Sequence, residues 1–167
     1  SRKEIVMTRS SVWIQQEICG VKLYVYRSNV QNATAIYFLD GDQFKEPFNH
    51  WIIKHQPSLN FVLINADNRT DDYTPWPLQA SETMPMDFGG KAEEHLSFIT
   101  THVIPFCESE YGLASSAEKR VIGGYSLGGL FSLYAAVNTD LFGTVLSCSS
   151  SLWYPGFLDY LKEHPFK

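Results

Sequence analysis

A serine between two glycines constrains this chain more than any other feature of its sequence. Residues 121–137 read VIGGYSLGGLFSLYAAV, an apolar run, a turn with Ser126 at its centre, and a run of small and apolar residues. This context for a G-x-S-x-G pentapeptide predicts a buried strand, a sharp turn and a helix. Gly124 and Gly128 lack the Cβ atoms that would collide in such a turn. We therefore expect Ser126 to be a nucleophile standing clear of a sheet; the alternative is an idle serine in a glycine-rich turn.

The remainder of the chain predicts an α/β fold. Apolar runs typical of strands buried on both faces recur along it, at residues 33–40, 61–67, 119–124 and 143–149. Segments with helical spacing of apolar residues lie between and after them, at residues 44–56, 89–112 with a bend near Pro105, and 127–137. This alternation predicts a mostly parallel central sheet, flanked by helices and arranged around the 33–40 strand. The first 28 residues alternate apolar and polar types and predict antiparallel strands, whereas 69–85 predicts a long polar loop.

The composition excludes several classes of protein. The 167 residues are 44% hydrophobic and 19% charged, as in a single globular domain, and no apolar run is long enough to span a bilayer. A net charge of −5 without a Lys/Arg cluster argues against a nucleic-acid or membrane partner. Cys19, Cys107 and Cys148 are far apart and odd in number, which favours buried free thiols in a reducing compartment and hence a cytoplasmic location. No motif for a metal, a nucleotide phosphate or a flavin is present, so we expect no cofactor.

An attacking serine also requires donors for the oxyanion that it creates. One is expected to be the amide of Leu127, directly after the serine, at the start of a helix. The second would come from the loop after an earlier strand, and FLDGD ends such a strand. The amide of Asp42, just past Gly41, is the candidate; the alternative is an ordinary tight turn at Asp40-Gly41.

Several stretches resemble the putative esterase family of α/β-hydrolases, which includes the enterochelin and ferric-siderophore esterases and, more remotely, the antigen 85 mycolyltransferases. They are YFLDGDQF, LINADNRTDDYTPWP, DFGGKAEEHLSFITTHVIPFCESEYG, RVIGGYSLGGLFSLYAAV and DLFGTVLSCSSSLWY. The resemblance implies an α/β-hydrolase fold and a serine carboxylester hydrolase working through an acyl-enzyme on Ser126. It also implies that Arg69 and Trp153 line the substrate cleft. Tyr125 stands where the family often has His or Gln, and is expected to contact the pocket.

A general base for Ser126 is missing from the pattern. In this fold the order along the chain is serine, acid, histidine, and the only histidine after Ser126 is His164. His164 lies in LDYLKEHP, which reads as a solvated helix end, and the other four histidines precede the serine on predicted helices. We therefore assign no base and expect residues 1–167 to form a single partial α/β-hydrolase domain lacking its last strands.

Two hypotheses about function follow. In the first, the chain is an inactive or weakly active truncated form of an esterase for a small-molecule ester. In the second, it is a non-catalytic binding or interaction module derived from an esterase. Either way, residues 144–151 are predicted to be an open edge strand. Copies would self-associate through this edge, or residues 152–167 would fold back and cap it.

Overall fold

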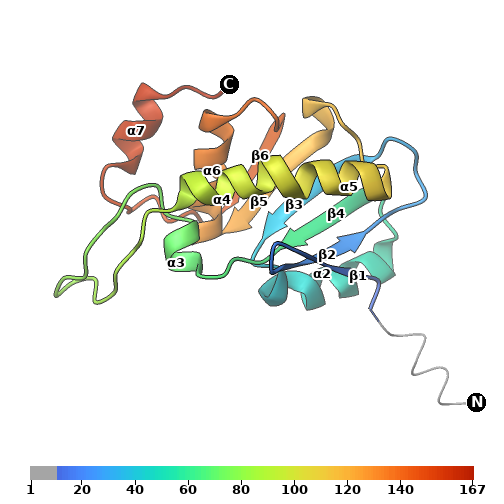
Figure 1. The fold of residues 1–167 in the computed structure, drawn as a ribbon, viewed down its shortest axis with the longest axis horizontal. Helices are drawn as coiled ribbons and strands as arrows, with labels where there is room; N and C mark the ends of the chain where they lie inside the picture. The colour runs from blue at the N-terminus through green and yellow to red at the C-terminus, as the bar shows by residue number, and fades with distance from the viewer. Residues whose placement is uncertain (1–10) are drawn as a thin grey trace, which may run out of the picture.

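Six strands form one sheet in the computed structural model, which describes residues 11–167 (Figure 1). The strands are β1 (Ile14–Ile18), β2 (Val21–Tyr26), β3 (Thr34–Leu39), β4 (Leu59–Ile64), β5 (Arg120–Tyr125) and β6 (Thr144–Cys148). Their order across the sheet is β1-β2-β4-β3-β5-β6. The neighbours from β4 to β6 pair in parallel, with β3 between β4 and β5 as the sequence predicts. The antiparallel pairing of β1 and β2 is also as predicted, although residues 1–10 of that segment lie outside the described residues.

Helices cover both faces of the sheet (Figure 1). They are α2 (Gly41–His55), α3 (Arg69–Asp72), α4 (Ala92–Phe98), α5 (Ile104–Tyr111), α6 (Leu127–Asn138) and α7 (Phe157–Glu163). A π-helical segment, η1 (Ile99–Val103), joins α4 to α5, and a 3₁₀ turn, η2 (Ala117–Lys119), precedes β5. The irregularity predicted near Pro105 is thus a π-helical turn, in which the missing proline N–H is accommodated within a continuous helix.

The predicted loop 69–85 requires a correction at its start. Residues 69–72 are helical because the side chain of Asn68 accepts hydrogen bonds from the amides of Thr70 and Asp71. An asparagine at this position satisfies two of the amides that a helix start leaves without partners. The short helix α3 carries Arg69 at its first position.

The core lies in two layers, one on each side of the sheet. Alternate strand residues, such as Leu23, Tyr37 and Ile64, pack with α4, α5 and α6 in the larger cluster. The residues between them, Tyr24, Phe38 and Leu63, face α2 in a smaller cluster.

The predicted burial on both faces is confirmed for β3, β4 and β5. It is wrong for the run at 143–149, because β6 lies at the edge of the sheet and each of its residues is exposed or half-buried. Of the three cysteines, Cys107 is buried as predicted, whereas Cys19 and Cys148 are exposed. Within residues 11–167 no helix is both long and apolar enough to cross a bilayer.

Candidate functional site

Ser126 occupies the turn between β5 and α6, with a backbone conformation that side chains rarely adopt (φ 60°, ψ −115°). A Cβ atom on Gly124 would lie 2.5 Å from the backbone of Gly128, so these two glycines pack directly on one another. Gly124 therefore allows the strand and the helix to approach closely. The expected collision is absent at Gly128, where a Cβ atom would meet only ordinary contacts of 3.5 Å and longer. Such strain costs about 1–3 kcal/mol and persists only where surrounding structure holds it.

Backbone hydrogen bonds from the serine segment, residues 147–151, hold this turn. The amide of Ser126 donates to the carbonyl of Cys148 at 2.9 Å. In return the amide of Ser151 donates to the carbonyl of Ser126 at 3.1 Å. The turn is thus fixed through its main chain, and the side chain of Ser126 is left out of the restraint.

The hydroxyl of Ser126 is partly exposed and has one side-chain partner. Its Oγ lies 3.3 Å from the Oγ of Ser151, which is 3% exposed. The amide of Leu127, at the first position of α6, donates no hydrogen bond to any described residue. A helix start with a free amide attracts developing negative charge, so this position suits an oxyanion.

The second predicted oxyanion donor, the amide of Asp42, already has an acceptor. It donates to the Oδ1 of Asn65 at 2.7 Å. The carboxylate of Asp42 accepts a hydrogen bond from the hydroxyl of Tyr24, and this bond is the main reason why the pKa of Asp42 is lowered. An oxyanion could use the Asp42 amide only by displacing the side chain of Asn65.

Arg69 is tied to the same junction through Asp40. Its guanidinium donates two hydrogen bonds to the Asp40 carboxylate, at 3.1 and 3.0 Å, and these bonds raise the pKa of Arg69. Asp40 has positive φ (57°), and its amide donates to the hydroxyl of the buried Tyr73 at 3.1 Å. A Cβ on Gly128 would lie 3.5 Å from Asp40 Oδ2, so the Asp40 carboxylate lies beside the start of α6. The structure thereby brings Arg69 and the Ser126 turn together.

Tyr125 and Trp153 are both exposed aromatic residues; Tyr125 directly precedes Ser126, and Trp153 comes two positions after Ser151. Tyr125 is 43% exposed and its ring packs edge-on against Phe44 of α2, with ring centres 6.1 Å apart. Trp153 is 51% exposed and lies 5.9 Å from the ring of Phe88. Both side chains are available to a ligand, and their predicted contact with a substrate remains a prediction.

No histidine among residues 11–167 forms a hydrogen bond with Ser126. His164 ends α7, as its sequence context predicts, and its ring stacks on Tyr160 with the centres 4.0 Å apart. His95 is buried against Phe131 and Tyr73, and burial lowers its pKa to about 4. Neither arrangement places an imidazole where it takes a proton from Ser126.

Sequence reasoning missed three residues that shape the site: Ser151, Asn65 and Tyr73. All three lie inside the stretches that carry the family resemblance, but no local pattern distinguishes them from their neighbours. Their importance depends on contacts between distant parts of the chain. Only a three-dimensional arrangement reveals such pairs.

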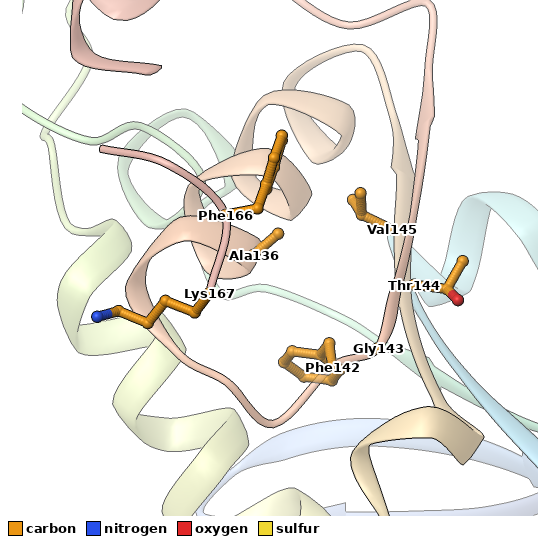
Figure 2. A pocket seen from close by; sticks show the side chains of 7 residues that line it. All are labelled: Ala136, Phe142, Gly143, Thr144, Val145, Phe166 and Lys167. Carbon is orange, nitrogen blue, oxygen red and sulfur yellow. The ribbon is translucent and has the colours of Figure 1, made fainter. Parts of the chain in front are cut away.

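A pocket lies at the end of the sheet opposite to the Ser126 turn. Figure 2 shows Phe166 and Lys167 of the C-terminal tail beside Ala136 of α6 and the first residues of β6. The Ser126 turn follows the carboxyl end of β5, whereas this pocket adjoins the amino end of the parallel strand β6. The pocket is therefore separate from the candidate site.

Comparisons with known proteins agree on one family. A family model described as "Putative esterase" matches residues 15–165. YbbA of Bacillus subtilis is 38% identical over 135 residues, covering 77% of this chain and 54% of that protein. The iron(III) enterobactin esterase of Escherichia coli is 29% identical over 125 residues, covering 70% of this chain and 28% of that protein. The chain thus spans about half the length, or less, of these curated relatives.

Two solved structures share the fold. The BES protein from Bacillus cereus superposes with a TM-score of 0.75 at 21% identity, covering 92% of this chain and 67% of that one. The siderophore hydrolase EstA from Aspergillus nidulans gives a TM-score of 0.72 at 22% identity, covering 93% and 63%. At such identities the likeness concerns the fold.

Proposed function

This chain belongs to the putative esterase family and has an α/β-hydrolase-like fold, and on this premise we propose that its protein is a serine hydrolase of carboxylic esters. Ser126 is the proposed nucleophile. The single observation that carries the proposal is the strained turn at Ser126, held by backbone bonds, with a free amide beside its hydroxyl. Strain of this kind is retained at reactive groups more often than in ordinary turns.

The proposed reaction has two steps. The Oγ of Ser126 bonds to the ester carbonyl carbon, its proton passes to a general base, and the bond to the leaving alcohol breaks as the alcohol takes that proton. Water then hydrolyses the acyl-enzyme, which releases the acid and restores Ser126. The amide of Leu127 stabilises the oxyanion in both steps, and the amide of Asp42 joins it when Asn65 yields its place.

The general base and its acid are proposed to lie outside these 167 residues. The absence of a histidine partner for Ser126 within residues 11–167, together with the greater length of the relatives, supports this placement. By itself the chain should turn over esters about 10⁴–10⁶-fold more slowly than a complete enzyme, with a residual rate from oxyanion stabilisation.

The substrate is proposed to be a small-molecule ester, held by Arg69, Tyr125 and Trp153. Three relatives are named as enterobactin esterases, so a siderophore ester is one candidate and a simple acyl ester the other. The exposed aromatic rings of Tyr125 and Trp153 supply apolar contact area, and the Nη1 of Arg69 keeps donors that Asp40 does not use.

Labelling with a fluorophosphonate probe tests the nucleophile. The probe should attach to Ser126, as located by mass spectrometry of peptides, in this chain and faster in any longer protein that contains it. Ser126→Ala should abolish labelling and p-nitrophenyl ester hydrolysis. Attachment at another residue, or equal hydrolysis by Ser126→Ala, would show that Ser126 is not the nucleophile.

We also propose that the chain interacts with a second copy through the open edge of β6, and a separate observation supports this role. β6 pairs only with β5 among the described strands, and Leu146 in its middle is 41% exposed. No strand from residues 152–167 pairs with β6, and α7 packs on α6 through Tyr160 and Tyr134. Phe166 and Lys167 of the tail line a pocket together with Thr144 and Val145, the first residues of β6 (Figure 2).

Sedimentation velocity distinguishes this interaction role from a purely monomeric protein. An open edge of this kind tends to pair with another strand, so the chain should form dimers at micromolar concentration. Leu146→Lys should return it to a monomer, since a charged edge resists pairing. A monomer at all concentrations would remove the interaction proposal and leave the esterase proposal untouched.

The predicted cytoplasmic location remains a prediction.

A further inference from the structure

Ser151 is a buried polar residue whose hydroxyl has one side-chain partner. It is 3% exposed, and its Oγ lies 3.3 Å from the Oγ of Ser126, the one hydrogen-bond partner of this hydroxyl among the described residues. A buried hydroxyl without a hydrogen bond costs free energy, so this one is expected to be committed to Ser126. The separation is long for an O–H···O bond, as is common at reactive serines before a substrate binds.

The neighbouring serines of the same segment are used differently. The hydroxyls of Ser147 and Ser150 bond to each other, and Ser147 also donates to the carbonyl of Gly129 on α6 at 3.0 Å. They fasten the serine segment to the helix. Ser151 takes no part in that fastening, although its amide holds the carbonyl of Ser126.

We propose that Ser151 is a positioning residue for Ser126, with its hydroxyl donating a hydrogen bond to the Ser126 Oγ. This inference rests on the proposed function. Donation from the buried side turns the proton of Ser126 outward, toward a base. The bond also strengthens as negative charge develops on the Ser126 oxygen, because hydrogen bonds to charged acceptors are stronger than those to neutral ones.

The first test measures the rate of fluorophosphonate labelling in this chain. Loss of one hydrogen bond to a charged oxygen should make Ser151→Ala about tenfold slower, with its pH profile displaced to higher pH. Ser151→Thr, which keeps a hydroxyl, should recover most of the rate. Ser150→Ala is the matched control, since it removes a hydroxyl from the same segment that does not touch Ser126. A Ser151→Ala variant that labels at the wild-type rate would overturn the proposal.

The second test does not depend on reactivity. In crystal structures, the Ser126 side chain should occupy one rotamer in the wild type and in Ser151→Thr, and several in Ser151→Ala. If neither this chain nor a longer protein that contains it labels at Ser126, the proposed function fails, and the rotamers alone decide whether Ser151 positions Ser126. A single unchanged rotamer in Ser151→Ala would then refute the positioning role. Equal melting temperatures of the variants exclude unfolding as the cause.

Discussion

Two neighbouring strand-to-helix junctions both place a non-glycine residue at positive φ, but different contacts hold the two turns. β3 passes into α2 through Asp40 (φ 57°), and the adjacent β5 passes into α6 through Ser126 (φ 60°). Neither residue is a glycine, so both turns are strained. The Asp40 turn is held by its side chain, which binds Arg69, whereas the Ser126 turn is held by main-chain bonds to the serine segment. The backbone carries the restraint at Ser126, which suits a serine proposed to act as a nucleophile.

The amides after these junctions differ as well. The Leu127 amide has no acceptor among the described residues, while the Asp42 amide is covered by Asn65. One donor is therefore ready for an oxyanion, and the other needs a side chain to move. In the proposed mechanism, the amide of Leu127 therefore supplies the larger share of the oxyanion stabilisation.

The largest expected effect on stability comes from replacing Gly124, one of the two glycines at the Ser126 junction. Gly124→Ala should lower the free energy of unfolding by about 3 kcal/mol or more, because the new Cβ meets helix backbone at 2.5 Å. Gly128→Ala should change it by no more than about 1 kcal/mol, because its Cβ meets only ordinary contacts near 3.5 Å. Urea unfolding followed by circular dichroism measures both. Equal effects would mean that the G-x-S-x-G glycines are not distinguished by this packing.

The effect expected next in size is the loss of stability at low pH through His95. This residue packs against Tyr73, whose hydroxyl accepts a hydrogen bond from the Asp40 amide. The folded pKa of His95, about 4, is below its unfolded value near 6.5, so the unfolded state binds more protons between these values. The stability contributed by neutral His95 is complete above pH 6.5 and declines as the pH falls toward 4. The loss at pH 5 should be about 2 kcal/mol.

His95→Phe should remove most of this pH dependence while keeping the aromatic contacts with Tyr73 and Phe131. The Nε2 of His95 has no hydrogen-bond partner, so its loss leaves no polar group unpaired. The measurement is the free energy of unfolding at pH 7.5 and pH 5. His102→Gln, an exposed change on the same helical run, is the control. A wild type that is equally stable at both pH values would contradict the buried neutral state of His95.

The sequence predicts the Ser126 junction better than the Asp40 junction, for a physical reason. At Ser126 the signals are local, since an apolar run, two glycines and a run of small residues all lie within 121–137. The central strands and their order follow from similar local patterns and from right-handed crossovers. These parts of the fold were accessible without a structure.

Contacts between residues that are far apart in the sequence could not be predicted from it. Arg69 and Asp40 are separated by 29 positions, and Ser151 and Ser126 by 25, with nothing in the sequence to join them. The family resemblance therefore predicts only that Arg69 lines the substrate cleft. The structure shows that its guanidinium also donates two hydrogen bonds to the Asp40 carboxylate. The direction of a surface polar side chain depends on tertiary packing, which local propensity does not encode.

The smallest expected effect sharpens the comparison between the two amides. Asn65→Ala removes the acceptor of the Asp42 amide, whose hydrogen exchange should become about five- to tenfold faster, since such a bond contributes roughly 1 kcal/mol. Stability should fall by no more than about that amount, because Asp42 is exposed and water replaces the lost acceptor. Exchange at Leu127 should not change, since Asn65 makes no bond to it. Asn68→Ala is the matched control, because Asn68 caps α3 and does not touch Asp42. If Asp42 and Leu127 already exchange equally in the wild type, Asn65 does not cover the second donor, and both amides are open to an oxyanion before any substrate arrives.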